Sequence, residues 1–308
     1  MRIAVMGLGG VGGFFAGKLA KAYKGSGEHE VIFIARGEHL QAIKKNGLKL
    51  ITPEGEFSAF PDLATANPVE AGNLDLVIFC VKSYGLDEAA KSLAGAVRKG
   101  TVILPLLNGV DIAERLQKAL PDTEVLNGAV YISAALEAPG VVRHKGGAGQ
   151  IVFGPERNED VEKYRYVEDV LRKADIKADL QKDAAVPIWT KYIFICPLAG
   201  LTSAVGKSFG AIMSDPQNSA MLKGLMEEVY KISKARGVHL PDDIVNVTMG
   251  KVNAFPPETK TSMQLDYEKG SQTELEIFTG YIVKSGKELG IPTPLNEKIY
   301  NELQKKSR

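Results

Sequence analysis

The feature that most constrains this chain is a glycine-rich turn between a strand pattern and a helix pattern near its start. Residues 2–6 are predicted to form a β-strand, and residues 11–23 have the pattern of a helix. The sequence GLGGVGG joins them and fits G-x-G-x-x-G at Gly7, Gly9 and Gly12. In that order, the three glycines permit a tight turn, a close approach of a ligand to the backbone, and close packing of helix on strand. The chain therefore begins with the β-turn-α unit from which parallel sheets are built.

The same turn predicts a dinucleotide-binding site. A diphosphate at the helix N-terminus would be stabilised by free backbone N–H groups and by the positive end of the helix dipole. We expect contacts from the whole turn: Gly7, Leu8, Gly9, Gly10, Val11 and Gly12. The end of the second strand, about twenty residues on, is where an acid binds the ribose 2′-hydroxyl of NAD. This chain has Arg36 there, whose guanidinium can pair with a 2′-phosphate, so the predicted cofactor is NADP (NADPH).

Strand and helix patterns alternate through the first half of the chain, which favours a parallel sheet with helices on both faces. Further strands are predicted over residues 30–35, 74–81 and 101–106. Further helices are predicted over residues 39–45, 86–97 and 112–119. Residues 125–154 contain short apolar runs without a helix between them, which indicates antiparallel strands added beyond the parallel sheet. One more helix (161–173) and a short strand (176–178) follow.

Strand patterns stop after residue 182. Residues 183–201 are predicted to form a helix that is apolar almost all round and therefore buried, with Pro197 expected to kink or end it. Residues 221–236 form an amphipathic pattern. Another amphipathic helix is marked by Leu275, Phe278, Ile282 and Leu289. The predicted fold class is α/β: an N-terminal Rossmann-type parallel-sheet domain with added antiparallel strands (1–180), followed by an all-helical C-terminal domain (181–308).

Composition narrows the classes of partner. Lys and Arg number 38 against 37 Asp and Glu, so there is no charge excess to favour nucleic acid or an anionic membrane. The first apolar run is broken by glycines, unlike a signal peptide, and the longest, residues 192–201, is half a membrane span. Cys80 and Cys196 lie in apolar stretches, as core thiols of a reducing compartment do, so no metal site is expected. We expect a cytoplasmic protein with a small-molecule partner. Its helical half could form a homodimer face or one buried core.

Two polar residues follow predicted central strands. Lys82 comes just after VIFCV, and Asn108 follows the strand that ends in LPLL. Ligands of open α/β sheets bind outside the carboxyl ends of the strands, near the point where the strand order reverses. Lys82 and Asn108 are therefore candidates for the same crevice as the glycine turn, although each could be an ordinary loop residue.

If the dinucleotide delivers a hydride to a carbonyl, the protein must supply a proton. Four histidines are present, and none falls at a predicted strand end facing the crevice: His29, His39, His144 and His239. A lysine is the next candidate, because loss of solvent can lower its pKa into a useful range. Lys191 lies within IWTKYIFICPLAGL, the most apolar helix pattern of the chain. Such an ammonium needs a partner or a cleft, unless its side chain extends to the domain surface.

A second helix pattern offers a complement to this lysine. The stretch TSMQLDYEKGSQTELEIFTGYIV contains Ser262 and Glu274. Phe278 is four residues beyond Glu274, so Glu274 is predicted to lean inward on its helix, with Glu276 on another face. The alternative for Glu274 is a solvated helix-surface glutamate.

These motifs together resemble the ketopantoate reductase family (2-dehydropantoate 2-reductases) over nearly the whole chain. The matching pieces are GLGGVGG, ARGEHL, VKSYGL, LLNGV, WTK and TSMQLDYEKGSQTELEIFTGYIV. The resemblance implies a Rossmann domain and a helical domain with the active site between them. It also implies NADPH-dependent reduction of 2-dehydropantoate to (R)-pantoate, on the route to pantothenate and coenzyme A.

The resemblance further implies a role for each matching residue. Lys191 would act as general acid on the keto oxygen, and Glu274 would hold the substrate and organise that lysine. Ser262 would bind the substrate carboxylate. The cofactor and substrate cleft would be completed by Lys82, Asn108, Glu274 and Arg36, the last at the 2′-phosphate.

Two positions depart from the family pattern. Where the family commonly carries asparagines, four and eight residues after the lysine, this chain has Ile195 and Ala199. Loss of such polar contacts can change specificity by orders of magnitude. Two alternatives therefore remain open: an NADP-dependent dehydrogenase of a different 2-oxo acid or opine-type substrate, and a non-catalytic NADP-binding regulator.

Overall fold

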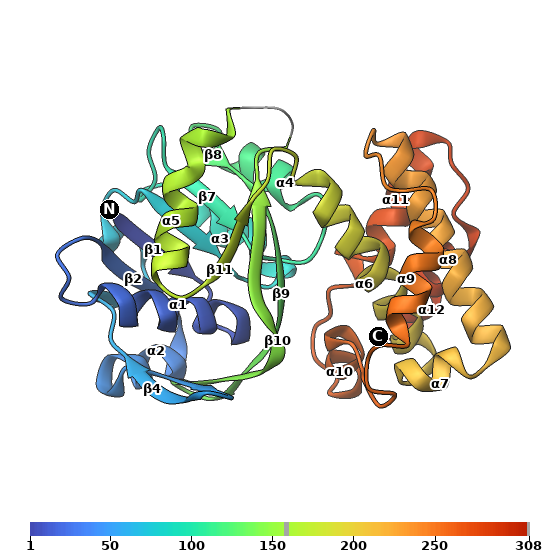
Figure 1. The fold of residues 1–308 in the computed structure, drawn as a ribbon, viewed down its shortest axis with the longest axis horizontal. Helices are drawn as coiled ribbons and strands as arrows, with labels where there is room; N and C mark the ends of the chain where they lie inside the picture. Colours follow the sequence, from blue (N-terminus) through green and yellow to red (C-terminus); the bar gives the residue numbers. More distant parts are fainter. Residues whose placement is uncertain (157–159, 307–308) are drawn as a thin grey trace. The chain divides into compact units, whose positions relative to one another are not determined.

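The computed structural model describes residues 1–156 and 160–306. The chain forms two compact units, Met1–Ala184 (unit 1) and Ala185–Arg308 (unit 2) (Figure 1). Unit 1 contains every β-strand of the described residues, and unit 2 is built from helices. The predicted fold class is therefore confirmed.

The main sheet of unit 1 has six strands, in the order β5-β2-β1-β6-β7-β8, and each neighbouring pair is parallel. Its strands are β1 (Arg2–Met6), β2 (Glu30–Ile34), β5 (Leu63–Thr65), β6 (Leu76–Phe79), β7 (Val102–Pro105) and β8 (Glu124–Val125). The order reverses between β1 and β6, so the carboxyl ends of these two strands flank the place where such sheets bind ligands.

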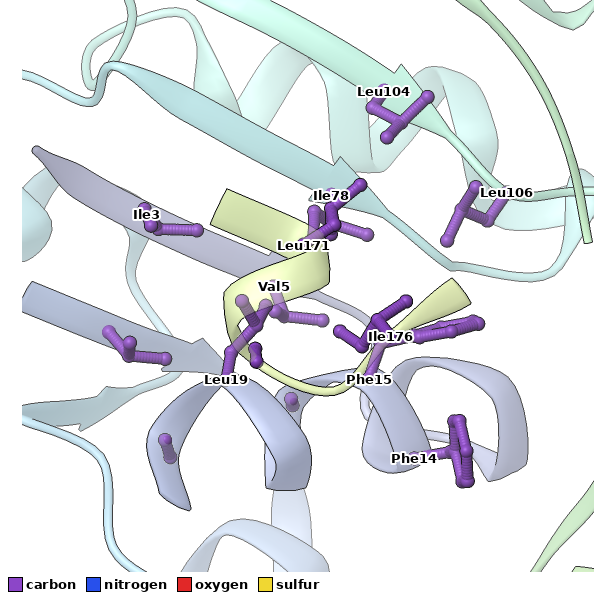
Figure 2. Close-up of a cluster of buried hydrophobic side chains, with 14 of the residues drawn as sticks. Ile3, Val5, Phe14, Phe15, Leu19, Ile78, Leu104, Leu106, Leu171 and Ile176 are labelled. Atoms are coloured by element: carbon purple, nitrogen blue, oxygen red, sulfur yellow. The ribbon is translucent and has the colours of Figure 1, made fainter. Parts of the chain in front are cut away.

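Helices alternate with the strands of unit 1. They are α1 (Gly10–Tyr23), α2 (Gly37–Asn46), α3 (Leu86–Leu93), α4 (Ile112–Ala119) and α5 (Arg165–Lys173), with the 3-10 helices η1 (Pro68–Ala71), η2 (Ser83–Gly85) and η3 (Val161–Tyr164). The core lies where α1 and α5 cover the sheet (Figure 2). Phe15 and Leu19 of α1 and Leu171 of α5 pack there with Ile3 and Ile78 of the strands, and all five are fully buried. Their burial holds the helix that begins at the glycine turn.

A second, mixed sheet accompanies the first. Its strands are β3 (Leu48–Thr52), β4 (Gly55–Ala59), β9 (Asn127–Ala138), β10 (Val141–Gly154) and β11 (Lys177–Leu180). The predicted antiparallel pair is β9 with β10, but β10 also pairs in parallel with β3 and β11. The β3–β4 hairpin was not predicted from the sequence. This sheet approaches the glycine face of α1, because a Cβ at Gly13 would lie 2.6 Å from a Val142 methyl group.

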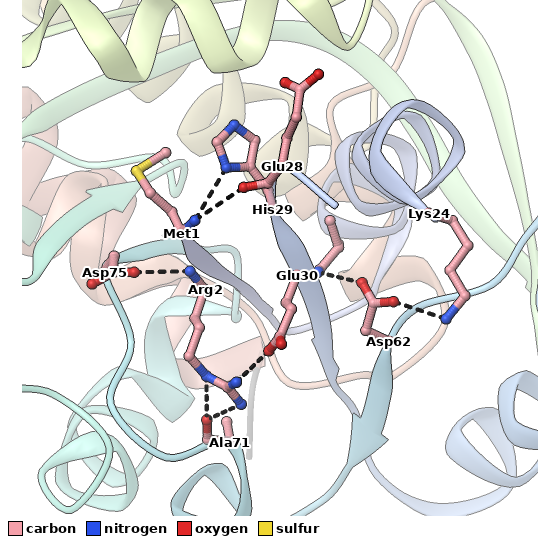
Figure 3. Close-up of polar contacts among 10 residues, drawn as sticks. Met1, Arg2, Lys24, Glu28, His29, Glu30, Asp62, Ala71 and Asp75 are labelled. Carbon is pink, nitrogen blue, oxygen red and sulfur yellow. Dashed lines mark hydrogen bonds and ion pairs between the residues drawn. The ribbon is translucent and has the colours of Figure 1, made fainter. Parts of the chain in front are cut away.

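The amino ends of the main sheet are closed by polar contacts (Figure 3). The backbone N–H of Arg2 donates to the Asp75 carboxylate (2.9 Å), and its guanidinium donates to the Ala71 carbonyl and pairs with Glu30. Asp62 accepts from the backbone N–H of Val31 at 2.8 Å. The Arg2 guanidinium and these carboxylates are engaged with one another or with the backbone. This edge therefore stabilises the sheet and does not offer groups for chemistry. The candidate functional groups of unit 1 lie at the opposite, carboxyl edge of this sheet.

Unit 2 consists of helices. They are α6 (Ala185–Val205), α7 (Phe209–Met213), α8 (Pro216–Ala235), α9 (Ile244–Val252), α10 (Ser262–Glu268), α11 (Thr279–Leu289) and α12 (Pro294–Lys306), with the 3-10 helix η4 (Leu275–Ile277). Among the described residues, α6 alone has the length and apolar composition to cross a membrane. The most apolar window of α6 is 72% buried inside the protein, as the core helix of a globular protein is.

Two predictions for unit 2 are corrected in part. Pro197 does not end its helix, because α6 continues to Val205, and the alternative that it kinks the helix stays a prediction. The surroundings of Pro197 are buried, so packing compensates for the one backbone hydrogen bond that proline cannot make. The single helix predicted from Leu275 to Leu289 is divided, because Leu275 lies in η4 and α11 begins only at Thr279. Leu289 is the last residue of α11 and is 37% exposed, so it does not belong to the buried face.

Candidate active site

The glycine turn has the geometry that its sequence predicts. Gly7 follows β1 with φ +89°, a left-handed conformation that glycine adopts without strain. A Cβ on Gly12 would lie 2.0 Å from the Gly7 carbonyl oxygen, so a side chain at either place would disrupt the turn. A Cβ on Gly9 would meet no protein atom within 4 Å. Packing within the protein therefore requires glycine at position 12, whereas Gly9 leaves open space beside the backbone.

This turn fits a bound diphosphate. Gly9 is the N-cap of α1, has no side chain to cap it, and no acid lies in the first turn of the helix. The first N–H groups of a helix have no intrahelical partner, and the helix dipole makes that end positive. An anionic ligand is the partner that these groups suit, so the residues present fit the phosphates of a dinucleotide.

Arg36 lies two residues after the end of β2 and is the N-cap residue of α2. Its side chain is 63% exposed, and its Nη1 is 3.0 Å from a carboxylate oxygen of Glu88, in the first turn of α3. The guanidinium is therefore accessible to a phosphate, but it already has a carboxylate partner. The sequence analysis did not predict a role for Glu88, although the acidic pair Asp87-Glu88 at the start of a predicted helix was an available signal.

Lys82 and Asn108 follow adjacent strands. Lys82 is exposed and lies two residues after Cys80, whose backbone N–H donates to the Met6 carbonyl of β1 at 2.8 Å. Asn108 is half-buried after β7, which pairs with β6. Because Gly7 also packs against the Cys80–Val81 backbone, both residues belong to the same carboxyl edge as the glycine turn. Their predicted ligand contacts remain predictions.

His39 of α2 joins two parts of unit 1. It is half-buried, and its Nδ1 accepts a hydrogen bond from the Gly140 backbone N–H at 2.8 Å. Burial lowers the pKa of His39, which favours the neutral ring that this bond requires. Its role is to join α2 to the β9–β10 hairpin.

Unit 2 contains the candidate proton donor. Lys191 lies on α6, half-buried among apolar neighbours, and burial lowers its pKa to about 8 while the negative charge of Glu274 acts in the opposite direction. Glu274 is 6% exposed. The pair thus combines an ammonium that can release its proton near neutral pH with a carboxylate whose negative charge raises the lysine pKa and so favours the charged form.

The prediction that Glu274 leans inward is confirmed, but the reason given for it is wrong. Glu274 is not on a long helix: it precedes η4, and Phe278 interrupts the helical backbone before α11 (φ −101°, ψ −110°). The position of this segment is fixed by Tyr192 of α6, whose hydroxyl donates to the carbonyls of Ile277 (2.7 Å) and Phe278 (2.9 Å). Tyr192 is the residue after Lys191, so the same helix turn carries the lysine and anchors the glutamate segment.

Ser262 is the first residue of α10 and is exposed. The preceding Thr261 caps the helix through a bond from the Gln264 N–H (3.2 Å). Thr261 also shares a 2.9 Å hydroxyl hydrogen bond with Thr202 of α6. This bond holds the Ser262 end of α10 on the helix that carries Lys191. Ile195 is half-buried and Ala199 is buried on that same helix, so these two positions offer no polar side-chain group.

The chain matches two models of known families. Residues 3–158 match "Ketopantoate reductase PanE/ApbA", and residues 183–307 match "Ketopantoate reductase PanE/ApbA C terminal".

The chain belongs to the ketopantoate reductase family.

This ketopantoate reductase family member is similar to individual proteins over its whole length. The chain is 30% identical to the uncharacterized oxidoreductase YkpB of Bacillus subtilis (strain 168), over 99% of this chain and 98% of that protein. The solved 2-dehydropantoate 2-reductase from Porphyromonas gingivalis W83 is 34% identical, covers 99% of each chain and has a TM-score of 0.87. A D-mandelate dehydrogenase solved with NADH and anilino(oxo)acetate is 23% identical, covers 100% of this chain and 98% of its own, and shares the fold with a TM-score of 0.88.

Family membership establishes the class of chemistry. Ketopantoate reductases are pyridine-nucleotide-dependent oxidoreductases acting on a CH–OH group, which sets aside the non-catalytic regulator. Within residues 1–156 and 160–306 there is no group of three or more His, Cys, Asp or Glu side chains that could hold a metal ion. A hollow of about 1130 Å³ in unit 1, bordered by Phe14, Lys18 and Phe57, is lined by none of the predicted site residues.

Proposed function

We propose that this family member reduces 2-dehydropantoate to (R)-pantoate with NADPH, in the cytoplasm. The observation that carries the proposal is that Lys191, with its pKa lowered to about 8 by burial, lies close enough to the buried Glu274 for the negative charge of Glu274 to act on it. That pairing suits proton transfer near neutral pH. The name of the Porphyromonas relative supports the choice of 2-dehydropantoate.

In the proposed mechanism, the α1 N-terminus binds the diphosphate and Arg36 binds the 2′-phosphate. The bound nicotinamide would supply hydride to the keto carbon. The Lys191 ammonium donates its proton to the keto oxygen, which converts the C=O bond into CH–OH. Glu274 stabilises the charged lysine beforehand, and the Ser262 hydroxyl donates to the substrate carboxylate. Lys82 and Asn108 complete the contacts with cofactor and substrate.

A panel of 2-oxo acids, each assayed with NADPH and with NADH, tests this proposal. The expected result is loss of nicotinamide absorbance with 2-dehydropantoate as the preferred substrate and NADPH as the preferred cofactor. No substrate-dependent loss with any oxo acid would refute the proposal.

A second candidate is a dehydrogenase of a larger, more apolar 2-oxo acid or of an opine-type substrate. It is favoured by Ile195 and Ala199, because apolar side chains there offer no hydrogen bonds to a polar substrate. The fold does not oppose it, since a D-mandelate dehydrogenase shares that fold. The same panel decides: a larger apolar oxo acid with a higher kcat/KM than 2-dehydropantoate would favour this candidate.

A homodimer stays a prediction, to be checked by light scattering.

The proposed proton donor predicts the pH dependence of kcat. Because the protonated form of Lys191 is the active one, reduction should be fastest below pH 8 and fall as the pH rises through about 8. Glu274→Gln removes the charge that raises the lysine pKa, so the fall should move to lower pH. Steady-state rates at saturating substrate across this range provide the measurement. An unchanged midpoint in the glutamine variant would argue against the pairing.

The proposed phosphate contact predicts the effect of Arg36→Ala. Loss of a charged hydrogen bond to phosphate should raise the KM for NADPH about 10- to 100-fold and leave the KM for NADH nearly unchanged. Arg98→Ala is the matched control, because Arg98 pairs with Asp75 (2.8 Å) at the amino edge of the sheet. Equal effects on both cofactors would show that Arg36 does not bind a 2′-phosphate.

A further inference from the structure

The ion pair of Arg36 with Glu88 lies between two segments that flank the glycine turn. Arg36 follows β2 and Glu88 lies in α3, which follows β6. These strands are the two neighbours of β1 in the sheet. The Nη1 to Oε1 distance is 3.0 Å, and the side chains are 63% and 73% exposed. A negative charge is therefore fixed beside the cation that is expected to hold the cofactor phosphate.

We propose that Glu88 sets the cofactor preference of this protein, because it reduces the ratio of NADPH affinity to NADH affinity. The proposal rests on the proposed role of Arg36 at the 2′-phosphate. It goes beyond that role, because it assigns a specificity function to a residue that has the opposite charge.

Two effects of Glu88 act against NADPH. The 2′-phosphate carries close to two negative charges near neutral pH, and it must take the guanidinium from Glu88 before it can bind. The released carboxylate then stays near a group of like charge. Exposed ion pairs are weak, so a phosphate can displace this one, at a modest loss of affinity.

Glu88 acts differently toward NADH. A carboxylate in this region can accept a hydrogen bond from a ribose hydroxyl, which is the contact that an acid supplies in NAD-binding sheets. The pair Arg36–Glu88 therefore holds one group suited to a phosphate and one suited to a hydroxyl. A site of this kind accepts both cofactors with a smaller difference in affinity than an unopposed arginine would give.

Glu88 also has a structural role, which the test must separate. It lies in the first turn of α3, whose N-cap Gly85 provides no side-chain bond, and acids there are favourable to the helix dipole. Asp87 shares that role but pairs with Arg115 instead, at 3.1 Å. Asp87→Asn is thus a matched control, with the same change of charge in the same helix turn.

The experiment measures dissociation constants of NADPH and NADH for the full-length protein and its Glu88→Gln variant, by fluorescence titration. We expect the variant to bind NADPH about fivefold more tightly, with NADH binding unchanged or weaker. The gain should shrink in about 0.5 M salt, because the charges are exposed. A purely structural role would give neither the cofactor difference nor the salt dependence.

Two outcomes are distinguished by Arg36→Ala. If that variant loses its NADPH preference while Glu88→Gln changes the NADPH to NADH ratio no more than Asp87→Asn does, the inference about Glu88 is wrong and the proposed function stands. If Arg36→Ala leaves the ratio unchanged, the proposed NADPH site itself is wrong.

Discussion

Replacing Lys191 by alanine is expected to lower kcat by about 10²- to 10⁴-fold, the range that a positioned general acid contributes. NADPH affinity should stay within a few-fold of the unaltered protein, because the proposed contacts with the diphosphate and the 2′-phosphate come from unit 1. Stopped-flow turnover and fluorescence titration of NADPH give the two quantities independently.

Lys207→Ala is a suitable control for that experiment. Lys207 is also a half-buried lysine of unit 2, but it pairs with Asp215 at 2.8 Å and has no proposed part in the reaction. Its removal should leave kcat near its original value. A Lys191→Ala variant that keeps most of its activity would exclude this lysine as the proton donor and would leave Glu274 without its proposed partner.

The second large effect is expected for Gly12→Ala. Its Cβ would lie 2.0 Å from the Gly7 carbonyl oxygen and 2.9 Å from the Cys80 Cβ, so the backbone of the turn must move. Overpacking of this kind costs about 1–3 kcal/mol, and here it also displaces the N–H groups proposed to bind the diphosphate. We expect a lower free energy of unfolding in urea together with loss of measurable NADPH binding.

Gly9→Ala separates the two consequences. Gly9 has φ −66°, and a methyl group on its Cα would have no protein atom within 4 Å, so alanine should leave the free energy of unfolding unchanged. NADPH affinity should still fall, because the methyl group would occupy space that the diphosphate needs. Unaltered NADPH binding in Gly9→Ala would place the cofactor away from this turn.

The sequence predicted the local units well, because their signals are local. The turn at Gly7 requires glycine, and the apolar run that becomes β6 has no other stable position than the sheet centre. Lys82 and Asn108 follow from the same strands, so their place at the carboxyl edge could be inferred. The roles of these residues in binding come from the family resemblance and not from the pattern.

Long-range relations could not be predicted from those signals. The β3–β4 hairpin depends on pairing with β10, which is about ninety residues away in the chain. The inward position of Glu274 depends on hydrogen bonds from Tyr192 to carbonyls near residue 277, and the helical period that suggested it is interrupted at Phe278. The Glu88 contact of Arg36 joins the N-terminal ends of α2 and α3, and the acidic pair that begins α3 does not by itself identify its partner.

The packing of Gly10 has a consequence for engineering. A Cβ there would lie 2.1 Å from the Ala134 carbonyl oxygen, so the backbone of β9 packs directly against the proposed phosphate-binding turn. The first twenty-odd residues are consequently not a portable module. If they were grafted onto a Rossmann scaffold without the second sheet, they would lose this packing contact. Cofactor affinity would then have to be restored by further design.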